Sequence, residues 1–234
     1  MSIFVIADLH LSFKNPKPMD IFGDNWENHE EKIRNDWLEK VADNDVVILP
    51  GDFSWAMNLE DAYLDFKYLN NLPGKKLLLK GNHDYWWTTI KKMHEYLEEN
   101  DFNTIDFIYN NSYCYENRII AGTRGWTLNS LEGDGKILNR ELGRLELSLL
   151  EGIEKYGSDK EITVFMHYPP ITNSSLLNHL ELKFVEVMKK YNVSRCMYGH
   201  LHGHSHKDAI EGNIEGIEFN LVSGDYLDFK LKKI

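Results

Sequence analysis

The sequence is poor in cysteine, and its two cysteines, Cys114 and Cys196, lie far apart and form no CxxC motif. A disulfide framework of the kind that holds small exported domains together is therefore excluded. The apolar stretch at the N-terminus lasts only a few residues before Asp8, which is too short for the core of a signal peptide. No later apolar run approaches the ~20 residues that a membrane span needs. We therefore expect a cytoplasmic protein without a membrane partner.

Basic residues are outnumbered as well, since 26 Lys and Arg stand against 37 Asp and Glu and the net charge is -11. Such a chain repels polyphosphate and anionic surfaces, so long nucleic acid is a disfavoured partner unless a local patch attracts it. Repeats, low-complexity tracts and linkers rich in Pro, Gly or Ser are missing too. The 234 residues, 42% of them hydrophobic, suit one domain with a sizeable core. We expect a single domain over residues 1–234.

What the sequence does contain is apolar runs rich in β-branched residues, which alternate with amphipathic segments. Runs at 2–7, 45–49 and 75–79 are typical of buried strands, and segments 29–42 and 59–72 place apolar residues on one helical face. Parallel strands joined by crossover helices are the natural packing for this pattern.

The second half of the chain continues the alternation. The pattern predicts a helix over 88–100, short antiparallel strands over 104–123, a helix over 137–156, a strand over 161–166, a helix over 175–191, a strand over 195–198 and β-structure over 214–234. Two β-sheets packed face to face with helices outside would place so many strands around one core. The predicted fold class is α/β.

Polar side chains follow five of these strands where the strands end. They are Asp8 and His10, Asp52, Asn82 with His83 and Asp84, His167, and His200 with His202. Taken singly, such a residue is more often a helix cap or a turn residue. In open α/β sheets, however, ligands bind at the carboxyl ends of the strands, so the joint pattern predicts convergence. Oxygen and imidazole donors without thiolate suit Mn, Fe, Zn or Co.

Four of the ten histidines stand at every second position between His200 and His206. In an extended chain, His200 and His202 point the same way and could serve neighbouring ions. We interpret His204 and His206 as solvated residues or as residues that orient the ligands.

The motifs Asp-x-His, Gly-Asp, Gly-Asn-His-Asp, a strand-terminal His and Gly-His-x-His resemble those of the calcineurin-like metallophosphoesterases, and the resemblance runs from Asp8 to His202. It implies a four-layer αββα sandwich of two mixed β-sheets flanked by helices, with two divalent metal ions at one edge. In that family, the first ion is held by residues that match Asp8, His10, Asp52 and His202. The second is held by residues that match Asp52, Asn82, His167 and His200, so Asp52 would bridge both ions.

The same resemblance implies a dinuclear metal-dependent phosphoesterase. Two ions lower the pKa of a bridging water and polarise the phosphoryl oxygens, so that hydroxide attacks a phosphomonoester or phosphodiester, small or nucleotide-like. His83 matches the family's catalytic histidine and would protonate the leaving group, with Asp84 orienting or charging it. The alternatives are a metal-dependent nuclease, a protein phosphatase, or a non-catalytic metal-binding scaffold of the same fold. A scaffold would be expected to lack part of the metal set or His83.

Candidate substrate-binding residues follow the proposed ligands. We predict that at least one of Trp55, Trp86 and Trp87 lines the metal cleft and stacks on an aromatic part of the substrate, although each could simply pack the core. Arg124 could hold a phosphate oxygen bidentately. The connection from Leu11 to Asn28 is too long for a simple turn, and such segments often form lids or binding rims.

Overall fold

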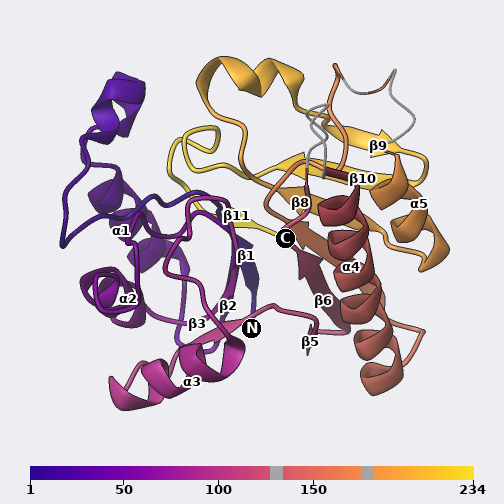
Figure 1. Cartoon of the computed structure of the whole chain (residues 1–234), viewed down its shortest axis with the longest axis horizontal. Coiled ribbons are helices and arrows are strands. Elements are labelled where there is room, and N and C mark those ends of the chain that lie inside the picture. The colour runs from indigo at the N-terminus through magenta and orange to yellow at the C-terminus, as the bar shows by residue number, and fades with distance from the viewer. Residues whose placement is uncertain (127–133, 175, 177–181) are drawn as a thin grey trace.

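The structure, a computed structural model of the chain, describes residues 1–126, 134–174, 176 and 182–234. Within these ranges, the chain forms two mixed β-sheets between two groups of helices (Figure 1). The predicted α/β sandwich of two helix-flanked sheets is therefore confirmed.

The first sheet contains five strands among the described residues, in the order β11-β1-β2-β3-β4. Their bounds are β1 Ile3–Val5, β2 Val46–Pro50, β3 Lys75–Leu79, β4 Ile105–Phe107 and β11 Lys232–Lys233. Strands β1 to β4 are parallel to one another, and only the edge strand β11 runs antiparallel to its neighbour. The carboxyl ends of β1, β2 and β3 therefore lie along one edge of this sheet.

The second sheet contains six described strands in the order β5-β6-β7-β8-β10-β9. Their bounds are β5 Tyr113–Tyr115, β6 Arg118–Thr123, β7 Glu161–Met166, β8 Arg195–Tyr198, β9 Gly212–Ile214 and β10 Ile217–Leu221. The four central strands are parallel, and β5 and β9 are antiparallel edge strands. The carboxyl ends of β7 and β8 are consequently neighbours.

Helices cover the outer face of each sheet (Figure 1). Beside the first sheet lie α1 (His29–Lys40), α2 (Tyr63–Asn70) and α3 (Ile90–Glu99), and beside the second lie α4 (Asp134–Tyr156) and α5 (Lys183–Lys190). The predicted helix over 175–191 is thus present over Lys183–Lys190, and most of its earlier part lies outside the described residues. In the described ranges, no helix combines the length and the apolar character needed to cross a membrane.

Apolar side chains on both faces of the sheets form the core. Ile3, Val5 and Ile48 point between the two sheets, whereas Phe4 and Val47 point toward the helices. Successive residues of a strand point to opposite faces, so each of these strands is buried on both sides. The candidate ligands, by contrast, lie beyond the strand ends.

Two predicted β-segments differ from the structure. The strand β4 pairs in parallel with β3, so only the β5–β6 hairpin within 104–123 is antiparallel. Near the C-terminus, strand β11 is confined to Lys232–Lys233, because Asp228 and Phe229 adopt positive φ angles of 53° and 55° that an extended strand does not accommodate. The Phe229 ring is buried against Trp26 instead.

Candidate metal centre

The loops that follow β1, β2, β3 and β8 are hydrogen-bonded to one another. The Asp8 amide donates to the Gly51 carbonyl (3.0 Å). The His200 amide donates to Oδ2 of Asp8 (2.9 Å), and the His83 amide donates to Oδ1 of Asp52 (2.8 Å). The candidate ligands predicted from separate strands are therefore brought together at one edge of the paired sheets.

One group of ligand atoms consists of Asp8, His10 and His202, whose donor atoms all lie within 4.8 Å of one another. Nε2 of His202 is 4.0 Å from Oδ1 of Asp8, and both atoms are buried without a hydrogen-bond partner among the described residues. A buried carboxylate oxygen without a donor is costly unless a cation compensates it. This pair of atoms therefore fits a divalent metal ion.

The second group consists of Asp52, His167 and His200, again within 4.8 Å of one another. Nδ1 of His167 lies 3.2 Å from the carbonyl oxygen of Pro50 and donates its proton there, which leaves the lone pair on Nε2.

That lone pair faces three further electron-pair donors: Oδ1 of Asn82 at 2.6 Å, Nδ1 of His200 at 3.2 Å and Oδ2 of Asp52 at 3.5 Å. Burial lowers the pKa of His167 and of His200 to about 3, so both rings are neutral near pH 7. Oxygen and imidazole atoms gathered this closely around Nε2 of His167 form a set that could bind a cation.

Asp52 lies between the two groups. Its Oδ2 is 3.7 Å from Nε2 of His10 and 3.5 Å from Nε2 of His167. Gly81 is required at its side, because a Cβ atom there would stand 2.1 Å from Oδ1 of Asp52. Asp52 is thus in the position of a ligand that both groups could share.

The backbone is strained at four of the candidate ligands. Asp8, His10, Asp52 and His200 have φ angles of 60°, 47°, 52° and 74°, in the left-handed region that residues with a Cβ seldom adopt. Such strain of order 1–3 kcal/mol per residue persists where the surrounding structure fixes it, and it is concentrated at functional sites. Here it turns four candidate ligands toward one another.

Asp225 contacts a candidate ligand, and the sequence analysis missed it. It follows β10, and its Oδ1 lies 2.8 Å from Nδ1 of His202. Its other oxygen accepts from the Gly203 amide (3.0 Å) and faces Nε2 of His206 at 3.2 Å. The signal for it was the apolar run ending in Gly-Asp, a pattern shared with Gly51-Asp52. His206 thus contacts the residue that orients a ligand, whereas His204 is exposed.

The carboxylate of Asp84 does not contact His83, which it was predicted to orient or charge. Its carboxylate accepts five hydrogen bonds, from the amides of Asp52, Phe53, Ser54 and Gly81 and from Nε1 of Trp86. Burial and the neighbouring Asp52 raise its pKa to about 7. These bonds hold the loops after β2 and β3 together, and Nδ1 of His83 faces the Tyr85 hydroxyl at 3.3 Å instead. The interpretation of Asp84 as the residue that orients His83 is therefore corrected.

His83 is half-buried beside the first group, with its ring centroid 5.6 Å from that of His10. Burial lowers its pKa, Asp52 opposes this shift, and the positive charge of Lys17 adds to it. The ring borders the metal-binding groups without belonging to either, which suits a proton carrier better than a ligand.

The three candidate substrate-binding tryptophans, Trp55, Trp86 and Trp87, differ in their burial and in their distance from the site. Trp55 is half-buried, with its ring centroid 4.1 Å from that of His83 and 5.0 Å from that of His10. Trp86 and Trp87 are buried with 2% and 9% exposure in the core of the first sheet and its helices. Trp86 and Trp87 therefore pack the core and do not line the cleft. Of the three candidates, only Trp55 adjoins the site, and its stacking on a substrate stays a prediction.

Arg124 follows β6 close to the second group, and its carbonyl accepts from the amide of Tyr168, the residue after His167. Its guanidinium is 3.9 Å from Glu141 and rests against the Trp126 ring at 5.0 Å. Binding of a phosphate by Arg124 stays a prediction.

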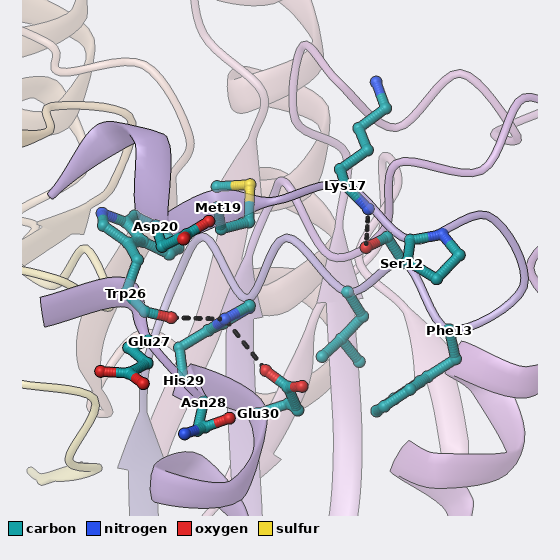
Figure 2. Close-up of a pocket in the computed structure, with 12 residues that line it drawn as sticks. Ser12, Phe13, Lys17, Met19, Asp20, Trp26, Glu27, Asn28, His29 and Glu30 are labelled. Atoms are coloured by element: carbon teal, nitrogen blue, oxygen red, sulfur yellow. Dashed lines mark hydrogen bonds and ion pairs between the residues drawn. The ribbon is translucent and has the colours of Figure 1, made fainter. Parts of the chain in front are cut away.

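The connection from Leu11 to Asn28 forms one wall of the site. It contains two short 3₁₀ helices, η1 (Met19–Phe22) and η2 (Asp24–Trp26). The Trp26 ring is buried, 5.7 Å from His10 and 5.6 Å from His202, so it supports the first group. Between this segment and the start of α1 lies a cavity of about 330 Å³ (Figure 2).

Comparisons with known proteins agree with this geometry. A model of the family described as calcineurin-like phosphoesterase matches residues 1–204. No curated protein matches the chain.

Several solved structures share the fold over nearly the whole chain. The protein of unknown function AQ665 from Aquifex aeolicus is 18% identical, with a TM-score of 0.52 and coverage of 99% of this chain and 95% of that one. Phosphopantetheinyl hydrolase (PptH) from Mycobacterium tuberculosis is 13% identical, with a TM-score of 0.58 and coverage of 100% and 95%. GAP50, the anchor in the inner membrane complex of Plasmodium, is 15% identical, with a TM-score of 0.51 and coverage of 96% and 71%. At these identities the likeness shows the fold alone.

Proposed function

The chain belongs to the calcineurin-like phosphoesterase family, and we propose that it is a dinuclear metal-dependent phosphohydrolase that cleaves a phosphomonoester or a phosphodiester. The observation that carries the proposal is the position of Asp52, whose Oδ2 lies within 3.7 Å of a histidine nitrogen of each group. One carboxylate shared by two groups of oxygen and imidazole donors supports a pair of ions such as Mn, Fe, Zn or Co.

Two such ions, when bound, supply an activated water and neutralise the charge on the phosphoryl oxygens. Some side chains of the site would hold the ions, and His83 would act on the substrate. Asp8, His10 and His202 would hold one ion with Asp52. The second would be held by Asp52, Asn82, His167 and His200.

His83 would donate a proton to the leaving oxygen. Its amide is fixed to the shared Asp52, so its ring is held at the border of both groups. A lowered pKa makes the imidazolium a stronger acid but reduces the protonated fraction of His83 near pH 7, so proton transfer from His83 should be favoured in mildly acidic solution. The complete ligand set and the presence of His83 support an enzyme over a scaffold.

The proposal is tested by turnover on a panel of esters with protein that has been stripped and reloaded with Mn, Fe, Zn or Co. The panel contains p-nitrophenyl phosphate, bis(p-nitrophenyl) phosphate, cyclic nucleotides, a dinucleotide, single-stranded DNA and a phosphopantetheinyl diester, the last because a protein of this fold is a phosphopantetheinyl hydrolase. The reloaded protein should hydrolyse at least one small ester and bind about two ions per chain.

Asp52→Asn should lower the occupancy of both groups and turnover by about 100-fold or more. Asp159→Asn, which changes an exposed carboxylate paired with Lys160, is the matched control and should behave as the wild type. The proposal fails if no ester is hydrolysed with any of the metals, or if Asp52→Asn is as active as its control.

A further inference from the structure

Lys17 stands at the wall formed by residues 11–28, with its Nζ 3.9 Å from the centroid of the Trp55 ring. That ring in turn packs 4.1 Å from the ring of His83. The lysine side chain is exposed and points away from the cavity beneath the segment (Figure 2). A positive charge therefore lies on the side of the site where the proposed proton donor is located.

The backbone that carries Lys17 is fixed. Pro16 and Pro18 flank it, and prolines restrict both their own φ angles and the residues before them. The Lys17 amide donates to Oγ of Ser12 (3.0 Å), and Nε1 of Trp55 donates to Sδ of Met19 (3.3 Å). The Lys17 backbone and the Trp55 ring are thus held in place, while the flexible four-carbon side chain allows the ammonium group to move from the ring to a ligand.

Lys17 and the nearby Lys14 contact different groups. Nζ of Lys14 is 2.6 Å from Oδ1 of Asp61, whereas Lys17 makes no ion pair with a carboxylate in the part of the chain that the structure describes. Lys32 and Lys67 also lie over aromatic rings without an ion pair among the described residues, but at 5.6 Å and 5.9 Å from the ring centroids, so the contact of Lys17 is the shortest of the three. An exposed cation–π contact is worth only about 0.5–1 kcal/mol, so an anion can draw the ammonium group away from the ring.

We propose that Lys17 binds a second phosphate of the substrate, next to the phosphate held at the metal centre, and that the protein prefers ligands with a diphosphate linkage. The inference rests on the proposed function of the same site. A flexible lysine acts as a point charge for phosphate. Because Lys17 lies on the His83 side, the second phosphate belongs to the leaving group: the P–O–P bond breaks, a water oxygen bonds to the phosphorus at the metal centre, and the second phosphate departs with the bridging oxygen as its anion.

The test compares, by calorimetry, two ligands of the Mn-loaded protein that contain no hydrolysable P–O–C or P–O–P bond, methylenediphosphonate as the two-phosphate ligand and methylphosphonate as the one-phosphate ligand. The wild type should bind the two-phosphate ligand about tenfold or more tightly than the one-phosphate ligand. Lys17→Gln should reduce this ratio toward one, and Lys17→Arg should keep most of it because the charge remains. Lys14→Gln, which changes the lysine three residues away, should leave the ratio at its wild-type value.

The inference is overturned if the wild type binds the two ligands with equal affinity. It is also overturned if Lys17→Gln lowers the affinities for both ligands by the same factor, or lowers neither. Metal content is measured after each titration, so that removal of Mn by the ligand is not counted as binding. Hydrolysis of p-nitrophenyl phosphate is measured in parallel. Turnover with an unchanged binding ratio would reject the role of Lys17 alone, whereas absence of turnover on every ester would reject the proposed function.

Discussion

The Nδ1 atom of His202 lies 2.8 Å from Oδ1 of Asp225, and this contact turns Nε2 of the same ring toward Asp8. The two residues come from the loops after β8 and β10, which are neighbouring parallel strands. The Gly203 amide and His206 contact the other oxygen of Asp225, so the carboxylate cannot rotate freely. A carboxylate that accepts from one ring nitrogen fixes the tautomer and leaves the other nitrogen to bind metal.

Asp225→Asn should therefore lower the affinity of the first metal-binding group by about 10–100-fold, while the second group is less affected. Competition with a calibrated chelator measures this change without reference to turnover. Asp228→Asn is the matched control, because Asp228 belongs to the same loop but is paired with Lys230 on the surface. Equal metal affinities for the two variants would show that Asp225 does not position His202.

Metal uptake should release a proton from His202. Burial opposes charge on this ring, but the hydrogen bond to Asp225 and the charges of Asp8 and Asp225 outweigh it and raise the pKa to about 9. At pH 7 the metal-free ring is therefore protonated, and an ion must displace the proton from Nε2. Apparent affinity should increase as pH rises toward 9 and then level off, with at least one proton released at pH 7, because burial also raises the pKa of Asp8 in the same group to about 7. Calorimetry of Mn binding in two buffers of different ionisation enthalpy counts the proton, and identical heats would contradict the assignment.

Much of the fold and most of the metal centre could be predicted because both follow from local pattern. Apolar β-branched runs mark strands that are buried on both faces, and a polar residue directly after such a run can only lie at the sheet edge. Asp8, Asp52 and His167 are examples, since each follows the strand that carries it. Their convergence follows from the parallel strands within each sheet and from the face-to-face packing of the two sheets.

Other features depend on contacts between loops, which a sequence pattern does not specify. Asp84 neighbours His83 in the chain, yet its carboxylate binds amides of the loop after β2. Trp86 has an apolar ring that suits a core or a substrate equally well, and only packing decides between them. Asp225 follows an apolar run that ends in Gly-Asp, but its contact with His202, which is 23 residues away, depends on how the two loops pack.

Lys76 should make stability depend on pH in a way that is independent of the metal centre. Its side chain is buried in β3, where Nζ donates to the Leu72 carbonyl and to Oγ1 of Thr104, and burial lowers its pKa to about 7. The unfolded chain keeps the ordinary pKa of 10.5 for this lysine. Between pH 7 and that value, the unfolded chain therefore binds more protons than the folded chain. Unfolding free energy should therefore be reduced below pH 7 and recover as pH rises from about 7 toward 10.

Lys76→Met should remove this dependence, so the stability difference between variant and wild type should be largest at pH 7 and below and shrink at higher pH. Urea unfolding at several pH values measures the difference. Lys75→Met is the control, because the adjacent lysine is only partly buried and lies near Asp106. A difference that stays constant with pH would show that Lys76 is charged in both states.

His83→Ala should separate catalysis from metal binding, because the ring of His83 borders the two ligand groups and belongs to neither. Metal content should stay near that of the wild type. Turnover should fall by about 10²–10⁴-fold for alkyl esters, whose leaving oxygen needs a proton, and much less for nitrophenyl esters, whose leaving group departs as the anion. His94→Ala is the control, since His94 is an exposed histidine on α3 that contacts Asp106. Equal losses for both kinds of ester, or loss of the metal, would remove His83 from the role of proton donor.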